Sequence, residues 1–252
     1  MATLPISARS PLQTNIFWRG LAAVLIMLGA WSGQVQAQTS QGEYIIVTGG
    51  CALQKWERYK EASHDKWWGN FVRASRVRVE EIQKEKGNVP ITMLVYRPSY
   101  ERRAAEDGQP LIANIESVRD KYKIRLVWFS TQDELINYLN NGQDRRTWPI
   151  ADFEYFGHSN RACFLFDYSN YIANGSRCWL HETELKRLTR GIWARDAHIK
   201  SWGCHTGESM SKMFKATTGK KMIGAVGKTD YSNGHLRGWV PALSGDDAHW
   251  TD

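Results

Sequence analysis

The sequence predicts an α/β fold with a mostly parallel central sheet that is covered by helices on both faces. Short apolar runs alternate with amphipathic stretches, and no low-complexity linker or internal repeat interrupts them after residue 42. The apolar runs are the expected strands, and in chain order they are Tyr44–Thr48, Ile91–Tyr96, Ile124–Phe129, Phe153–Phe156, Cys163–Tyr168, His198–Trp202 and Met222–Val226.

Helices are expected between these strands. Apolar residues at helical spacing predict a helix over His64–Lys86 and another over Leu111–Tyr122. A further helix should follow Thr131 and end at Asn141-Gly142, because threonine is a good N-cap and glycine a common stop. The remaining expected helices run from His181 to about Arg190 and over Gly207–Thr217.

Residues 1–37 have the order of a secretory signal peptide. Arg9 and Arg19 come without an acid, Leu21–Trp31 is apolar, and Val35-Gln36-Ala37 offers small residues for cleavage. The apolar run is shorter than the roughly 20 residues that span a bilayer, although an uncleaved anchor is the competing interpretation. We therefore expect residues 38–252 to form one secreted or periplasmic domain with no stable membrane insertion after cleavage.

The formal charge of +7 does not indicate a nucleic-acid partner. The basic residues are scattered, and Arg73, Arg76 and Arg78 lie close in sequence to Glu80 and Glu81. Such mixing is typical of a solvated helix face. Nothing in the sequence indicates an oligomeric state.

Two strand ends carry an imidazole and a thiol. The strand at Phe153 leads into Gly157-His158, and the strand at His198 leads into Gly203-Cys204. If the two strands are neighbours, both groups lie at the carboxyl edge of the sheet, where functional groups of such folds gather. A thiol at a helix N-terminus gains thiolate character, and an imidazole can take its proton and later protonate a leaving amine. Gly203 and Gly207 leave the backbone N–H groups open to an oxyanion.

These residues resemble the motifs of caspase-like (clan CD) cysteine peptidases, and of metacaspases most closely. Tyr155-Phe156-Gly157-His158 resembles the Y-S-G-H-G strand end, and Gly203-Cys204-His205-Thr206-Gly207 resembles the D-x-C-H-S-G segment. His158 precedes Cys204 by 46 residues, which is similar to the family's spacing.

The resemblance implies a caspase-like three-layer α/β/α sandwich and an endopeptidase that acts on a peptide or protein substrate without a cofactor. Cys204 would be the nucleophile and His158 the general acid and base. Backbone N–H groups of Ser159 and Cys204, beside Gly203, would hold the oxyanion.

The chain departs from the metacaspase pattern at two positions. Ser159 replaces the glycine after the histidine, and Trp202 replaces the aspartate two residues before the cysteine. Specificity for basic residues is therefore not implied. Asp230 could supply an acid to a specificity pocket, while an ordinary turn aspartate is the competing interpretation. Trp202 and Cys51 are further candidates for substrate contact.

The departures motivate two other hypotheses. One is a catalytically inactive binding protein on the caspase-like scaffold, and the other is a Cys–His acyltransferase or amidase.

An exported chain with four cysteines can form disulfides. Cys163–Cys178 is the candidate bridge, and a Cys51–Cys204 bridge competes with the nucleophile role of Cys204. No metal site is predicted, because the chain has no C-x-x-C, H-E-x-x-H or similar ligand spacing.

Overall fold

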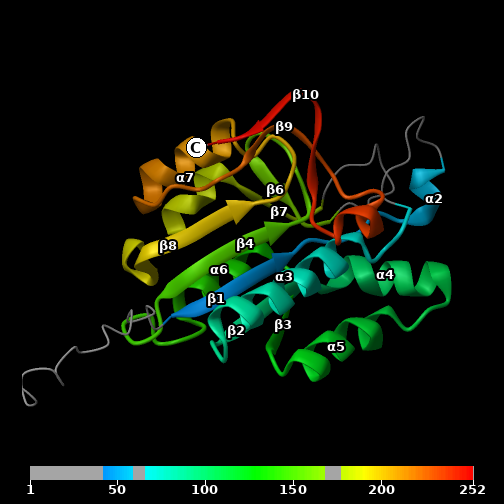
Figure 1. The fold of residues 1–252 in the computed structure, drawn as a ribbon, viewed down its shortest axis with the longest axis horizontal. Helices are drawn as coiled ribbons and strands as arrows, with labels where there is room; N and C mark the ends of the chain where they lie inside the picture. Colours follow the sequence, from blue (N-terminus) through cyan, green and yellow to red (C-terminus); the bar gives the residue numbers. More distant parts are fainter. Residues whose placement is uncertain (1–41, 59–65, 168–176, 252) are drawn as a thin grey trace, which may run out of the picture. The chain divides into compact units, whose positions relative to one another are not determined.

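Five parallel strands form the central sheet in the computed structural model, which describes residues 42–58, 66–167 and 177–251 (Figure 1). The strand order is β3-β2-β1-β4-β8. The bounds are β1 Glu43–Thr48, β2 Ile91–Tyr96, β3 Arg125–Phe129, β4 Ile150–Phe156 and β8 Trp193–Ser201. The predicted α/β class and parallel sheet are confirmed. The predicted leader, residues 1–37, and residues 64–65 of the first expected helix lie outside the described residues.

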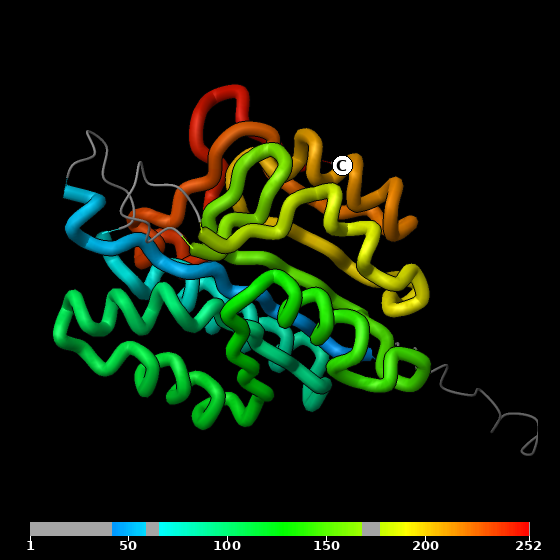
Figure 2. The backbone as a smooth tube through the Cα atoms, turned by 180° about the vertical axis from the view of Figure 1, so that it is seen from behind, coloured from blue at the N-terminus to red at the C-terminus, as the bar shows by residue number. Residues whose placement is uncertain are grey.

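Both faces of the sheet are covered, as a three-layer sandwich requires (Figures 1 and 2). On β1, Ile46 faces α3, while its neighbours Ile45 and Val47 face the opposite core. One layer holds α3 Asn70–Lys86, α4 Arg97–Asp107 and α5 Leu111–Tyr122. The other holds α6 Gln132–Asn141, α7 Ser209–Thr218 and the short helix η1 Glu182–Arg187, with the small sheet β5 His158–Ser159, β6 Cys163–Leu165 and β7 Trp179–His181.

The remaining elements are short or lie apart from the main sheet. They are α2 Gln54–Glu57, η2 Arg190–Ile192, β9 Ala225–Asp230, η3 Gly234–Arg237 and β10 Ala242–Trp250. Strands β9 and β10 pair with each other as an antiparallel ribbon.

Three expectations about the elements were wrong. The expected strand Met222–Val226 does not continue the main sheet, since Ile223 forms only an isolated bridge with Lys200 and β9 pairs with β10 instead. The expected α-helix after His181 is two 3₁₀ turns, and their three-residue spacing directs Leu185 and Leu188 into the core. Helix α4 was not among the expected helices, and Pro98 lies in its first turn, where proline is favoured.

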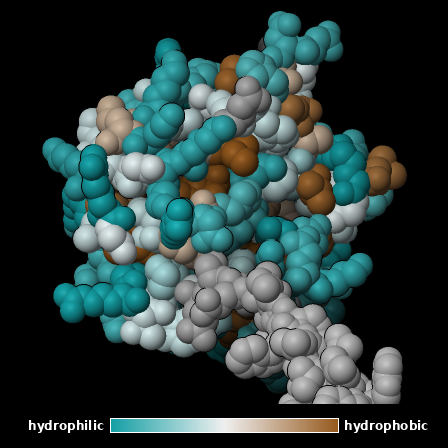
Figure 3. Space-filling model, turned by 60° about the vertical axis from the view of Figure 1, so that its left-hand side comes forward, coloured by the Kyte–Doolittle hydropathy of each residue, from teal (hydrophilic) through white to brown (hydrophobic). Residues whose placement is uncertain are grey.

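The solvent-facing surface in Figure 3 is mainly hydrophilic, with apolar side chains in small separate patches. Among the described residues, no helix is long and apolar enough to cross a membrane.

A buried ion pair fixes the start of the sheet. Glu43, at the first position of β1, is fully buried and accepts a 2.6 Å hydrogen bond from Arg145. Its second carboxylate oxygen accepts hydrogen bonds from Thr92 of β2 and from the Tyr138 hydroxyl of α6. The carboxylate therefore joins the first two strands to the helix that covers them.

We expect Arg145→Met to lower the free energy of unfolding by about 3–5 kcal/mol, because it leaves the Glu43 carboxylate buried without its cation. Urea denaturation at neutral pH measures the loss. The double variant Glu43→Gln/Arg145→Met should recover part of it, and a double variant that loses the sum of the two single effects contradicts this account.

Candidate active site

The two strands that carry the predicted site are neighbours. Strands β4 and β8 are parallel, with Phe153 opposite Ile199 and Tyr155 opposite Ser201. Their carboxyl ends therefore release Gly157-His158 and Gly203-Cys204 at the same edge of the sheet. The Trp202 N–H also donates to the Tyr155 carbonyl at 2.8 Å, which extends the pairing to the residue before Gly203. The condition for placing both groups at one edge is therefore met.

The two loops touch each other directly. The Ser159 hydroxyl donates to the Cys204 carbonyl at 2.7 Å. A Cβ atom on Gly203 would lie 2.1 Å from the Ser159 oxygen, so only glycine allows this approach. Ser159, a departure from the metacaspase pattern, thus ties the histidine segment to the cysteine segment.

Tyr155 holds the histidine segment through a side-chain hydrogen bond. Its buried hydroxyl donates to the His158 carbonyl at 2.6 Å and lies 3.2 Å from the Leu165 carbonyl on β6. Its ring stacks on Phe164 with centroids 4.3 Å apart. Burial raises the pKa of this phenol well above its usual value, so the hydroxyl remains a donor at all ordinary pH values.

The His158 ring rests on helix α3. It meets the Phe71 ring edge to face with centroids 4.9 Å apart, and Phe71 meets Tyr231 in the same way at 4.8 Å. Within the antiparallel pair of β5 and β6, Asn160 N–H donates to the Cys163 carbonyl. The alternation of such a ladder turns the Ser159 N–H away from β6.

The Cys204 thiol makes its hydrogen bonds with Thr229 of β9. The Thr229 N–H donates to the sulfur at 3.3 Å, and the thiol lies 3.5 Å from the Thr229 hydroxyl. Cys204 is half-buried and lies in turns that precede α7, which begins only at Ser209. The expected placement of the thiol at the N-terminus of a helix was therefore wrong, and a dipole that fades within one turn contributes little there.

The residue after the thiol has a left-handed backbone. His205 has φ of 61°, which is uncommon for a residue other than glycine. Its imidazole Nδ1 lies 2.7 Å from the Glu208 carboxylate, and its backbone N–H donates to the Gly227 carbonyl. These bonds hold the turn in which Cys204 lies.

The other three cysteines are buried thiols, and neither candidate disulfide forms. Cys163 lies opposite His181 in the small sheet, whereas Cys178 accepts a hydrogen bond from Phe166, the residue after the end of β6. Cys51 packs against Val72 and Met93 in the core with no exposed surface, so its proposed contact with substrate is also wrong.

Asp230 makes the contacts of a turn aspartate. Its carboxylate accepts the Ser232 N–H at 2.7 Å and pairs with Arg237 at 3.2 Å. Trp202, by contrast, faces the region beside the two loops. Its ring stacks on Phe156, and its indole N–H donates to Glu154 at 2.6 Å.

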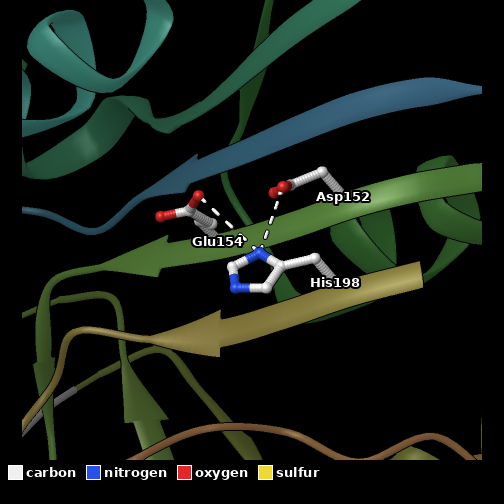
Figure 4. A group of neighbouring side chains, drawn as sticks. All are labelled: Asp152, Glu154 and His198. Atoms are coloured by element: carbon white, nitrogen blue, oxygen red, sulfur yellow. Dashed lines mark hydrogen bonds and ion pairs between the residues drawn. The ribbon is translucent and has the colours of Figure 1, made fainter. Parts of the chain in front are cut away.

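Sequence reasoning missed a row of charged residues on β4 and β8. Asp152 lies opposite His198, and Glu154 lies opposite Lys200, all on the sheet face toward α3. Their ligand atoms converge in Figure 4, where Asp152, Glu154 and His198 lie within 4.8 Å of one another. The signal was present, because charged residues alternate with apolar ones in both segments, whereas strands buried on two faces are usually apolar throughout.

This row does not favour a metal ion. The Arg78 guanidinium from α3 pairs with Glu154 and lies 3.8 Å from Asp152, so it already supplies the positive charge. Glu154 uses its second oxygen to accept the Trp202 N–H. Burial, followed by the charge of Asp152, raises the Glu154 pKa.

Comparison of the chain with protein-family models, with curated proteins and with solved structures finds no match. The geometry of the chain itself therefore carries the functional argument.

Replacing Tyr155 with phenylalanine should lower the free energy of unfolding by about 1–3 kcal/mol, because a buried carbonyl loses its donor. It should also change the environment of the His158 ring. Guanidinium denaturation and the His158 imidazole resonances measure the two effects. Phe153→Leu, on the same face of β4, is the control, and it should lower stability without shifting those resonances.

The His198 titration should depend on Asp152. A hydrogen bond to the Asp152 carboxylate raises the His198 pKa above its ordinary 6.5. The protonated His198 therefore stabilises the folded state fully below pH 6.5, and this contribution is lost as the pH rises through the raised pKa. Asp152→Asn should lower the midpoint in an NMR titration of His198. An unchanged midpoint would mean that the carboxylate does not cause the shift.

Proposed function

We propose that this protein is an exported cysteine endopeptidase with a caspase-like scaffold, in which Cys204 and His158 form the catalytic dyad. The observation that carries the proposal is the contact of the two strand ends through Ser159 and Cys204, at 2.7 Å. It brings a half-exposed thiol and an imidazole to one edge of a parallel sheet, where the chemistry of such folds collects.

In the proposed reaction, the Cys204 sulfur attacks the carbonyl carbon of a peptide bond. His158 takes the thiol proton and gives it to the leaving amine as the C–N bond breaks, which leaves a thioester on Cys204. A water molecule then gives one proton to His158 and attacks the thioester. The carboxylic acid product and the thiol are released when that proton returns to the sulfur.

Two backbone groups are suited to hold the oxyanion. They are the N–H groups of Ser159 and Cys204. The Ser159 N–H points away from β6, and Gly203 has no side chain to shield the Cys204 N–H. Ser159 also restrains the Cys204 carbonyl, so the two loops keep a fixed spacing while charge develops between them.

The thiol must leave Thr229 before it attacks. Its contacts there, 3.3–3.6 Å from sulfur, are those of a weak donor and acceptor. Substrate binding therefore competes with Thr229 for the sulfur, and no covalent bond has to be reduced first.

We expect a thiol-reactive peptide probe to label the folded protein at Cys204 alone. Cys51, Cys163 and Cys178 are buried, and burial raises the pKa of Cys163 and raises that of Cys178 to about 11. Mass spectrometry of the digested adduct locates the label.

Cys204→Ala should abolish labelling and all peptide hydrolysis, and His158→Ala should reduce hydrolysis at least about 100-fold. Cys163→Ala is the matched control and should keep both activities. Hydrolysis that survives in Cys204→Ala rules out the dyad. Labelling without hydrolysis of any peptide in a broad library would favour the catalytically inactive binding protein instead.

A further inference from the structure

A cavity of about 270 Å³ lies beside the cysteine loop on the α3 face of the sheet. Its polar and aromatic lining comes from Arg78, Glu154, Phe156, His198, Lys200 and Trp202. Sites for small molecules and cofactors are usually about 300–1,000 Å³. This cavity therefore has the size to receive one amino-acid side chain.

The cavity lies within reach of the dyad. Trp202 forms part of its wall and is separated from Cys204 by one residue, Gly203. On α3, Phe71 contacts His158, while Ala74 and Arg78 line the cavity. These three residues follow one face of the helix, so the cavity begins about 5–10 Å along the helix axis from the imidazole contact. A residue whose carbonyl is at Cys204 could thus place its side chain in the cavity.

The two carboxylates that line the cavity both contact Arg78. Glu154 pairs with Arg78 through one oxygen and accepts the Trp202 indole N–H through the other. Glu81, at the rim, also pairs with Arg78 at 3.2 Å. A cationic substrate side chain would therefore have to compete with Arg78 for these carboxylates.

Lys200 is the cation of the cavity without an acidic partner. Its ammonium lies 3.4 Å from the centre of the Trp202 ring and 4.3 Å from that of the Trp250 ring. Within the part of the chain that the structure describes, no carboxylate forms an ion pair with it. Burial lowers the Lys200 pKa, whereas the charge of Glu154 acts against that shift, and an anion bound beside the ammonium would likewise favour its charged form.

The rest of the lining suits a short aliphatic stem. Phe156, Trp202, Val77 and Val240 offer apolar surface, and the ammonium of Lys200 supplies hydrogen-bond donors. His198 also lines the cavity, and its hydrogen bond to Asp152 raises its pKa.

We propose that this cavity is the specificity pocket of the enzyme and that it binds an acidic side chain, glutamate or aspartate, through Lys200. The assignment rests on the proposed function, since it places the residue that precedes the cleaved bond beside Trp202. It makes Lys200 a specificity-determining residue in place of the acid that metacaspases carry before their cysteine.

The test compares pairs of peptides in which one side chain is either a carboxylate or its neutral amide. Fluorogenic peptides with Glu or Gln, and with Asp or Asn, before the cleaved bond are hydrolysed by the wild-type protein and by Lys200→Met. The wild type should prefer the acid over its amide by about 10-fold or more in kcat/KM, and Lys200→Met should lose that preference. Lys200→Arg, which keeps the charge and the aromatic contacts, should retain part of it.

Lys212→Met is the matched control, because Lys212 is an exposed lysine on α7 away from the cavity. It should keep the wild-type preference. Circular dichroism of each variant establishes that it is folded. Equal rates for acid and amide, or a preference for Lys or Arg peptides, would overturn the acidic pocket and leave the dyad intact.

Binding to Cys204→Ala separates the two proposals. Calorimetric titration of this variant with the same peptides should show tighter binding of the acidic members, and Lys200→Met in the same background should remove the difference. If the wild type hydrolyses nothing while this binding difference holds, the peptidase fails and the acidic pocket stands. Absence of both refutes the pocket together with the enzyme.

Discussion

The hydroxyl of Tyr155 holds together the parts on which the rest of the site depends. At the carboxyl end of β4, this hydroxyl donates to the His158 carbonyl and lies beside the Leu165 carbonyl, while the Tyr155 carbonyl accepts the Trp202 backbone N–H. One residue therefore joins the histidine segment, the small sheet and the strand that leads to Cys204. Its ring is fully buried against Phe164, so the hydroxyl has little freedom to move away. A rigid sheet end is what allows two loops to keep a fixed spacing.

The inner strands β1 and β2 could be predicted because each contains an apolar run, which burial on both faces of a sheet favours. Ile91–Tyr96 is a strand with the predicted bounds, and Leu111–Tyr122 is a helix with the predicted bounds. The ribbon of β9 and β10 could not be predicted in the same way. Its residues are largely half-exposed or exposed, and they carry too little apolar periodicity to distinguish a strand from a loop. Helix α4 was missed because a proline such as Pro98 is typical both of a residue that ends an element and of the first turn of a helix.

The candidate site was predictable in its positions and not in its contacts. The alternation of strands and helices predicted a parallel sheet, and His158 and Cys204 share one edge because β4 and β8 are neighbours in it. Which groups the thiol bonds depends on β9, and that strand belongs to the ribbon that the sequence did not reveal. Lys200 was missed for a related reason. Its charged neighbours are Glu154, opposite it on β4, and Arg78, on a distant helix, and no local spacing records either of them.

Thr229 connects the thiol to the cavity. Its N–H donates to the Cys204 sulfur, while its hydroxyl donates to the Trp202 carbonyl at 2.9 Å. A two-stranded ribbon is marginal by itself, so β9 depends on such contacts for its position. His205 and Gly207 add to them by donating to the carbonyls of Gly227 and Ala225. A substrate side chain that presses on Trp202 therefore acts on the same residue that holds the sulfur. In the proposed enzyme, this threonine would couple the filling of the cavity to the release of the thiol, so that a matching side chain would favour attack.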